Sequence, residues 1–275
     1  MQALLKRSLL VIVGAIVLAV PVFGQQPKSE PAVPAKTMAE IRSRGNLRVG
    51  LAMFLPWAMR NEKGELMGFD IDVAKQLADS LGVEVQYFPV PQSELVADLD
   101  RGRYDVIVSG LYVTPTRALQ VNFSDFYSKS DVTLLANRKM AGTFHAVADF
   151  NKPAIKIGVT SGTLYVEIAK ANFPEATIKE FGDEAEALEA VQSGELHAAV
   201  AATPRPDIDA MRFPDKVFLP LAQPLSTQGE AFAVRKGDPD FINFLNAWIR
   251  YYEQNGWLDD RRAFWFKTLN WANDL

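Results

Sequence analysis

The segment GRYDVIVSG, residues 102–110, joins a glycine to an apolar stretch that is expected to form a buried strand and that runs into a second glycine. A related segment, GELHAAVAA at residues 194–202, has the same order of glycine and apolar strand. Each segment follows a stretch with helical periodicity, residues 94–101 and 183–193, which its first glycine ends. A helix, a glycine and a strand repeated in this way predict two similar α/β lobes rather than one large sheet.

Strands and helices alternate on either side of these two segments. The expected strands lie at residues 47–51, 83–87, 104–108 and 155–159, and a helix is expected at 70–81. We expect Asp70 or Asp72 to cap this helix and Gly82 to end it. Alternating strands and helices predict βαβ units and a mostly parallel sheet, so the expected fold class is α/β.

The N-terminal residues have the pattern of an export signal. A short basic start precedes an apolar run at residues 8–20, which is short for a membrane span, and small residues follow it. We expect residues 1–24 to be a cleaved signal peptide, with an uncleaved membrane anchor as the alternative. Residues 25–36 are rich in proline and small residues, which is typical of a disordered linker. The folded part is expected to begin near Thr37.

The composition excludes several kinds of function. The formal net charge of the 275 residues is −4 and no basic run occurs, so nucleic acid is not an expected partner. Cysteine is absent, which excludes disulfides and thiolate chemistry and suits an oxidising compartment. The two histidines, His145 and His197, are far apart and have no ligand-like neighbours. We therefore expect no metal site and no cofactor.

Four segments occur in a characteristic order. They are LRVG at 47–50 with Pro56-Trp57, GFDID at 68–72, YDVI, TPTR and FSDFY at 104–107, 114–117 and 123–127, and GVTSGT at 158–163. Together they resemble the family 3 extracellular solute-binding proteins, the polar amino acid-binding proteins of ABC importers.

The resemblance implies a periplasmic-binding-protein-like fold of type II, with two lobes joined by two hinge strands near residues 131–135 and 231–234. Lobe one would comprise residues 37–131 plus 229–275, and lobe two residues 132–228. The ligand would lie between the lobes. The resemblance also implies a periplasmic monomer that works with ABC permease subunits in the inner membrane.

Arg117 is the first candidate for a ligand-binding residue. Thr114 and Pro115 match an N-cap followed by proline at the first helical position, which puts Arg117 in the first turn of a helix. A cation there opposes the helix dipole, so it is not expected to serve helix stability. Its guanidinium could grip a carboxylate through two hydrogen bonds. The resemblance places it at the family's carboxylate-binding arginine; the alternative is a surface arginine paired with Asp125.

Further candidates surround this arginine. The resemblance implies a lobe-one floor and an aromatic cover for the ligand, formed by Gly110, Tyr112, Thr114, Phe54 and Trp57; Trp57 could instead belong to the core. Ser161, Gly162 and Thr163 precede a helix, so free N–H groups and a hydroxyl predict an anion site that closes on the carboxylate from lobe two. Ordinary helix capping is the alternative for this segment. No catalytic residue is expected.

Lobe two departs from the pattern of the α-amino acid binders. The resemblance places their ammonium-binding aspartate at Ala202, which cannot pair with a cation. A buried ammonium without a partner would cost several kcal/mol. Two hypotheses follow: the ligand is an organic or keto acid without an α-ammonium, or another acid, such as Asp207 or Glu230, supplies the counter-charge.

Two other functions must be considered. Residues 241–271 also resemble the periplasmic cyclohexadienyl dehydratases, which share this fold and use a lobe-two glutamate as general acid. Arg205 stands at that position, and its pKa is too high for useful proton donation near neutral pH. We therefore expect a binding protein rather than an enzyme. A sensor that presents its ligand to a receptor is the other alternative.

Overall fold

A computed structural model of the chain describes residues 36–268 and 270–274. The expected signal peptide at 1–24 lies outside the described residues, as does the expected linker at 25–36 except for its last residue. Lys36 begins the first helix, α1 (Lys36–Arg44), one residue before the expected start of the fold. Within the described residues, we find no helix with the length and apolar character needed to cross a bilayer.

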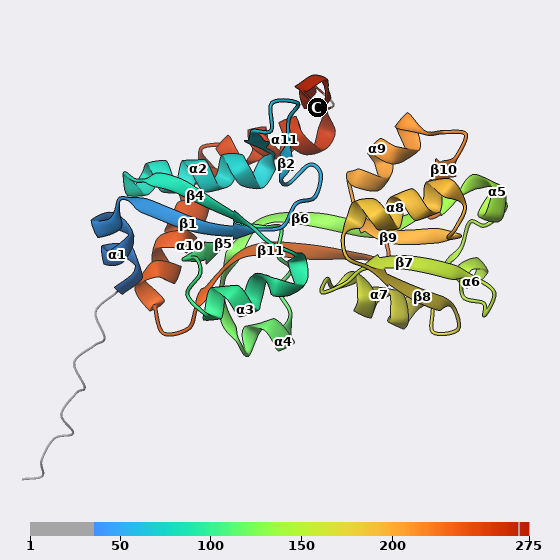
Figure 1. Ribbon diagram of the computed structural model, residues 1–275, viewed down its shortest axis with the longest axis horizontal. Helices are drawn as coiled ribbons and strands as arrows, with labels where there is room; N and C mark the ends of the chain where they lie inside the picture. The colour runs from blue at the N-terminus through green and yellow to red at the C-terminus, as the bar shows by residue number, and fades with distance from the viewer. Residues whose placement is uncertain (1–35, 269, 275) are drawn as a thin grey trace, which may run out of the picture. The chain divides into compact units, whose positions relative to one another are not determined.

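One sheet runs through both halves of the described chain (Figure 1). Its strands are β1 (Asn46–Leu51), β4 (Glu84–Pro89), β5 (Val106–Ile107), β6 (Val121–Asn137), β7 (Lys156–Thr160), β8 (Thr177–Phe181), β9 (Ala198–Ala202), β10 (Val217–Phe218) and β11 (Ser226–Arg235). The order is β4-β1-β5-β11-β6-β9-β7-β8, with β10 beside β6. A separate pair is formed by β2 (Met59–Arg60) and β3 (Leu66–Met67).

The pairing divides the sheet into two similar halves. Strand β1 is parallel to β4 and β5, and β7 is parallel to β8 and β9. The long strands β6 and β11 are antiparallel to each other and join the two sets, because β11 also pairs with β5 and β6 also pairs with β9. We call the half with β4, β1 and β5 lobe one, and the half with β9, β7 and β8 lobe two. This is the predicted α/β fold with two lobes. The expectation that the lobes would not share one large sheet is wrong, because β6 and β11 join the strands of both lobes in a single sheet.

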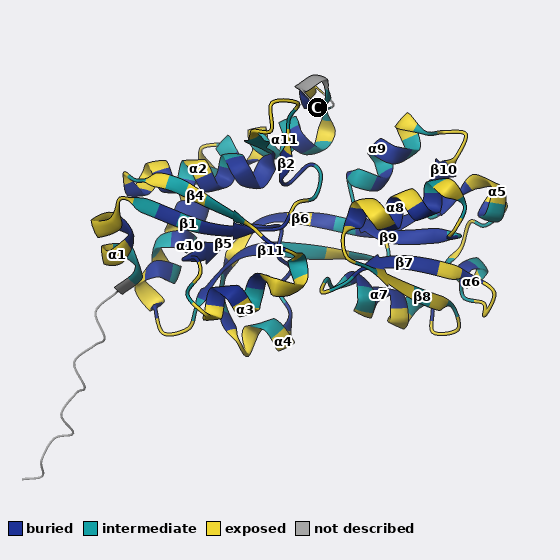
Figure 2. Cartoon of the chain, in the orientation of Figure 1, coloured by how far each residue is buried: buried dark blue, intermediate teal, exposed yellow. Residues whose placement is uncertain are grey.

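Helices cover the strands of each lobe (Figure 1). Lobe one carries α1, α2 (Phe69–Leu81), η1 (Gln92–Glu94), α3 (Leu95–Asp100), α4 (Pro115–Ala118), α10 (Pro239–Gln254), α11 (Trp257–Lys267) and η2 (Asn270–Asp274); lobe two carries α5 (Arg138–Ala141), α6 (Val147–Phe150), α7 (Tyr165–Asn172), α8 (Glu184–Ser193) and α9 (Arg205–Arg212). Figure 2 shows the central strands mostly in dark blue, and all five residues of β9 are buried. The core therefore lies between the sheet and its helices.

The ends of the helices agree only in part with those predicted from the sequence. Gly82 and Gly194 end α2 and α8 in the left-handed conformation, as predicted. The predicted cap of α2 is wrong: the N-cap is Gly68, and no side chain caps the helix. Asp70 is instead fully buried inside the first turn, where Tyr127 donates a hydrogen bond to its carboxylate.

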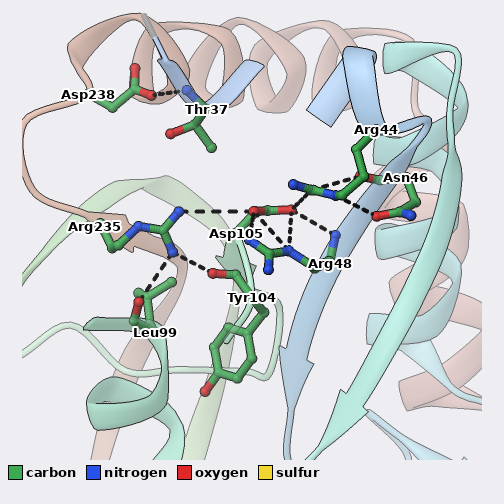
Figure 3. Close-up of polar contacts among 9 residues, drawn as sticks. All are labelled: Thr37, Arg44, Asn46, Arg48, Leu99, Tyr104, Asp105, Arg235 and Asp238. Atoms are coloured by element: carbon green, nitrogen blue, oxygen red, sulfur yellow. Dashed lines mark hydrogen bonds and ion pairs between the residues drawn. The ribbon is translucent and has the colours of Figure 1, made fainter. Parts of the chain in front are cut away.

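A cluster of arginines around Asp105 connects several elements of lobe one (Figure 3). The Asp105 carboxylate is buried and pairs with Arg44, Arg48 and Arg235. Arg235 also donates to the main-chain carbonyls of Leu99 and Tyr104. The cluster links α1, β1 and β11 to the residue that precedes β5. It therefore fixes the amino-terminal parts of β1 and β5, whose carboxyl ends face the cavity described next, and the carboxyl end of the antiparallel strand β11.

Candidate ligand-binding site

A cavity of about 700 Å³ lies at the carboxyl ends of the parallel strands of both lobes. Lobe one lines it with 52–55, 58–60, 89–92, Gly110, Tyr112 and Arg117, and lobe two with Thr160, 163–165, 182–185 and Arg205. These segments follow β1, β4 and β5 on one side and β7, β8 and β9 on the other. Ligands of α/β proteins bind outside the carboxyl ends of strands, and the volume suits a small molecule.

Arg117 projects into this cavity from a short helix that forms as predicted. The Thr114 hydroxyl oxygen accepts a hydrogen bond from the Arg117 main-chain N–H, and Pro115 is the first helical residue. The guanidinium donates to the Tyr112 carbonyl at 2.8 Å and to the Gly162 carbonyl of lobe two at 2.9 Å. Burial lowers the pKa of Arg117, and the charge of Glu167 offsets part of this effect.

The alternative of a surface pair between Arg117 and Asp125 is wrong. Asp125 pairs with Arg250 at 3.3 Å, on the outside of lobe one. In residues 36–268 and 270–274, no carboxylate oxygen lies within 4.0 Å of the Arg117 guanidinium. Both of its hydrogen-bond partners are neutral carbonyl groups, so its charge is not compensated by an ion pair.

The cavity floor is formed by Gly110 and Tyr112. Gly110 has a φ of +50°, and an added Cβ would lie 3.0 Å from the Trp57 ring and 3.1 Å from the Phe54 ring, so a larger residue would strain the backbone and displace these rings. The Tyr112 hydroxyl is 2.8 Å from the Ser130 hydroxyl, which donates to Glu230 at 2.7 Å. This chain of hydrogen bonds fixes the orientation of the Tyr112 ring.

The two candidate aromatic residues have different environments. Phe54 lines the cavity and stacks on Trp57 with ring centroids 4.8 Å apart. Trp57 is fully buried, and its indole N–H donates to a Glu230 carboxylate oxygen at 3.1 Å. Of the two alternatives given for Trp57, the structure has the core placement, because the ring is fully buried and its only polar group is hydrogen-bonded in the core. Its role is to support Phe54 from behind.

The segment at residues 161–163 departs from the expected anion site. Thr163 lines the cavity, whereas Ser161 and Gly162 do not. The main-chain N–H of Ser161 donates to the Phe181 carbonyl at 2.9 Å, and the main-chain N–H of Thr163 donates to the Thr160 carbonyl at 3.4 Å. The prediction of free N–H groups is thus wrong for these two residues. The group of this segment that meets Arg117 is the Gly162 carbonyl.

Glu184 is a cavity residue that the sequence analysis missed. It lies in the first turn of α8, where an acidic residue is commonly explained by the helix dipole. Its side chain is only 6% exposed, lines the cavity, and has a carboxylate oxygen, Oε2, without a hydrogen-bond partner. Burial raises its pKa to about 7, although the charge of Arg205 acts in the opposite direction.

The acids considered as counter-charges do not face this cavity. Glu230 is 1% exposed, and its two carboxylate oxygens accept hydrogen bonds from Ser130 and Trp57. Asp207 lines a separate cavity of about 1140 Å³ beside β6 and α11. Ala202 is buried in β9, where it pairs with Val132 of β6. Among the described residues, no three potential ligand side chains gather as a metal site would require.

Arg205, which stands at the position expected for a general acid in the dehydratases, also lines the cavity. Its guanidinium pairs with the buried Asp209 carboxylate at 3.1 Å, one helical turn further along α9. The pair fixes the side chain and neutralises its charge. Arg205 is thus a cation on the lobe-two side of the cavity whose position is fixed by its ion pair with Asp209.

The chain is similar to known binding proteins and to one enzyme. It is 27% identical over 228 residues to the L-cystine-binding protein TcyJ of Escherichia coli (strain K12), and 25% identical over 228 residues to the cyclohexadienyl dehydratase of Pseudomonas aeruginosa; each match covers 82% of this chain and 85% of the relative. A crystal structure of the ancestral amino acid-binding protein AncCDT-1, a precursor of cyclohexadienyl dehydratase, superimposes with a TM-score of 0.77 at 35% identity, covering 84% of this chain and 99% of that one.

A protein-family model also matches most of the described chain. Residues 47–268 match the model of the bacterial extracellular solute-binding proteins, family 3. The two-lobed sheet and the cavity at its strand ends agree with this match. The chain therefore belongs to the bacterial extracellular solute-binding proteins of family 3.

Proposed function

We propose that this protein captures a small solute with a carboxylate group, an amino acid or a related acid, in the cavity between its lobes. The observation that carries the proposal is the Arg117 guanidinium, which lines the cavity without an ion-pair partner among the described residues. An arginine has five N–H donors in a planar fork, and the Arg117 guanidinium donates one hydrogen bond to the Tyr112 carbonyl and one to the Gly162 carbonyl. The remaining donors can form a bidentate pair with a carboxylate.

The other site residues have distinct proposed roles. Gly110 and Tyr112 form the floor under the ligand, Phe54 covers it, and Thr163 contacts it from lobe two. Thr114 acts indirectly, because its hydroxyl holds the first turn of α4 and so positions Arg117. Their common placement around one cavity supports these roles.

We also propose the lobe boundaries given above, residues 37–131 plus 229–275 and residues 132–228. The pairing of β6 supports the first change of lobe. Val132 is the first residue of β6 that pairs with β9, and the Asp131 carbonyl accepts a hydrogen bond from Thr203 just beyond β9. The hinges would then lie within β6 and β11, near 131–135 and 231–234.

Membership of an extracellular family supports a periplasmic location after removal of residues 1–24. We propose that the protein works as a monomer and delivers its ligand to the permease subunits of an ABC importer. The similarity to an L-cystine-binding protein supports transport of an amino acid.

Catalysis is the second candidate function, because one relative is a cyclohexadienyl dehydratase and Glu184 is a buried acid with a pKa of about 7. We propose binding rather than catalysis. Arg205 occupies the position expected for the acid of those enzymes, and it is engaged by Asp209. The ancestral protein AncCDT-1, which is 35% identical to this chain, is an amino acid-binding protein.

Thermal unfolding of residues 25–275, unfolded and refolded to remove bound ligand, tests the proposal. The ligands are the common amino acids, the matching keto acids, dicarboxylates and prephenate. A ligand at about 100 times its Kd should add about 2.7 kcal/mol, which corresponds to a rise of several degrees in Tm. Stabilisation by an amino acid or a related acid is expected. Absence of any shift, together with consumption of prephenate, would favour the enzyme instead.

A further inference from the structure

Five charged side chains line the cavity, and three of them have their polar groups engaged elsewhere. Arg60 is exposed at the rim and donates to the Gly64 carbonyl. Arg205 pairs with Asp209, which is 2% exposed behind it. Asp183 is exposed and caps α8 by accepting a hydrogen bond from the third residue of the helix. Solvent screens the exposed charges of Arg60 and Asp183, and Asp209 neutralises Arg205, so none of these three charges needs a ligand as its partner.

Arg117 and Glu184 are the remaining two, and both lack a counter-ion. Arg117 donates only to main-chain carbonyls. Within the described part of the chain, no basic nitrogen lies within 4.0 Å of the Glu184 carboxylate, and its Oε2 has no hydrogen-bond partner. A charge buried without a partner costs several kcal/mol. The cavity thus contains one uncompensated cation from lobe one and one uncompensated anion from lobe two.

We propose that Glu184 binds a cationic nitrogen of the ligand while Arg117 binds its carboxylate. The ligand class is therefore a solute that carries both charges, such as an amino acid. This inference rests on the proposed function, which places the carboxylate on Arg117. Glu184 would supply the counter-charge that Ala202 lacks, from the start of α8 rather than from the end of β9.

The surroundings of Glu184 make such binding dependent on pH. The charged and titratable groups that face it are Arg205 and Asp209 from α9, Asp183 before α8, and Tyr112 and Tyr165 across the cavity. Burial raises the Glu184 pKa to about 7, so part of the carboxyl is protonated at neutral pH. A cationic ligand selects the ionised form. Binding near pH 7 should therefore release a proton, and affinity should rise between about pH 6 and pH 8.

Titration calorimetry of the wild-type chain, E184Q and E189Q tests the inference. Glu189 is an exposed acid on the same helix, so E189Q is the matched control. The probes are L-arginine, L-glutamine and 5-guanidinopentanoate. Loss of a buried charge partner is expected to weaken binding roughly 30-fold or more in E184Q. E189Q should stay within about twofold of the wild type, because exposed charges contribute little.

The three probes separate the two possible sources of the cation. If Glu184 binds the α-ammonium group, E184Q weakens L-arginine and L-glutamine but leaves 5-guanidinopentanoate unchanged. If it binds a side-chain cation, E184Q weakens L-arginine and 5-guanidinopentanoate but leaves L-glutamine unchanged. Either pattern supports the role of Glu184. Equal affinities of E184Q and the wild type for every probe would overturn it.

A second measurement needs no variant. Titration of the wild type at pH 7 in two buffers of different ionisation enthalpy reports the protons released on binding. A release that disappears at pH 9 is expected, and no release at pH 7 would contradict the inference.

Wild-type binding of pentanoate or 2-oxopentanoate alone would overturn the role of Glu184 but leave the Arg117 site standing. Failure of every carboxylate to bind would refute the proposed function itself.

Discussion

Glu184 carries a free-energy cost that should be visible in the stability of the ligand-free protein. The pKa of Glu184 is about 7 in the folded state and about 4.5 in the unfolded state, because burial in the folded state disfavours the charged form. The folded state therefore binds more protons between these values. Its contribution to the free energy of unfolding is fully present below pH 4.5 and is lost as the pH rises through about 7.

Urea unfolding of the wild type and E184Q from pH 5 to pH 8 measures this effect. Other buried acids, such as Asp70 and Glu230, also have raised pKa values, but they act equally in both proteins. We expect the stability of E184Q relative to the wild type to increase by roughly 2.5 kcal/mol across this range. A difference that does not change with pH would show that Glu184 is not held in its neutral form.

The residues of the cavity differ in how far they could be predicted from the sequence. The position of Arg117 in a capped first turn follows from Thr114 and Pro115, which are local signals, and the structure has this turn. The sequence cannot tell which aromatic side chain after β1 enters the core, so the core and the ligand site remained alternatives for Trp57 until the structure showed it fully buried. Glu184 was missed because its burial depends on the packing of α9 and the cavity wall rather than on its own helix.

The central strands β1 and β7 are equivalent elements of the two lobes. Each contains a glycine against which a large side chain packs. An added Cβ at Gly50 would lie 2.3 Å from the Tyr104 ring, and one at Gly158 would lie 2.6 Å from the Leu196 side chain. Tyr104 and Leu196 are the third residues of the two related segments at 102–110 and 194–202. The repeat seen in the sequence thus corresponds to the same packing in both lobes.

Alanine at these two glycines should destabilise the protein unequally. Gly50→Ala drives a Cβ into a rigid ring and should lower the free energy of unfolding by about 1–3 kcal/mol. Gly158→Ala should cost less, because the end of the Leu196 side chain can move. Gly182→Ala is the control, since its Cβ would approach only the Glu186 carboxylate, at 3.7 Å. Urea unfolding that ranks Gly182→Ala below Gly50→Ala in stability would contradict this packing.

Most elements were predictable because their periodicity and terminal glycines are local. The start of α2 was not, since Asp70 looks like a cap but is drawn into the core by its hydrogen bond with Tyr127. Helix α3 begins at Leu95, after the short η1 turn, one residue later than expected. The long strands β6 and β11 were expected only from the family resemblance, because pairing between strands so far apart leaves no local pattern.

In the whole molecule, the two lobes meet at the cavity as well as along β6 and β11. The Arg117 guanidinium donates to the Gly162 carbonyl across the cavity. Gly162 also packs closely on the main chain of Ser93, where an added Cβ would lie only 2.6 Å away. A ligand bound to Arg117 would therefore lie beside the contact that joins the lobes.

The most direct test of ligand capture by Arg117 is calorimetric titration with the amino acid or acid that stabilises the protein most. The wild type should bind one ligand per chain. R117A removes two charge-assisted hydrogen bonds and should weaken binding about 100-fold or more. R250A removes an exposed arginine of the same lobe and should bind like the wild type. Binding by R117A with wild-type affinity would show that the ligand carboxylate is held elsewhere.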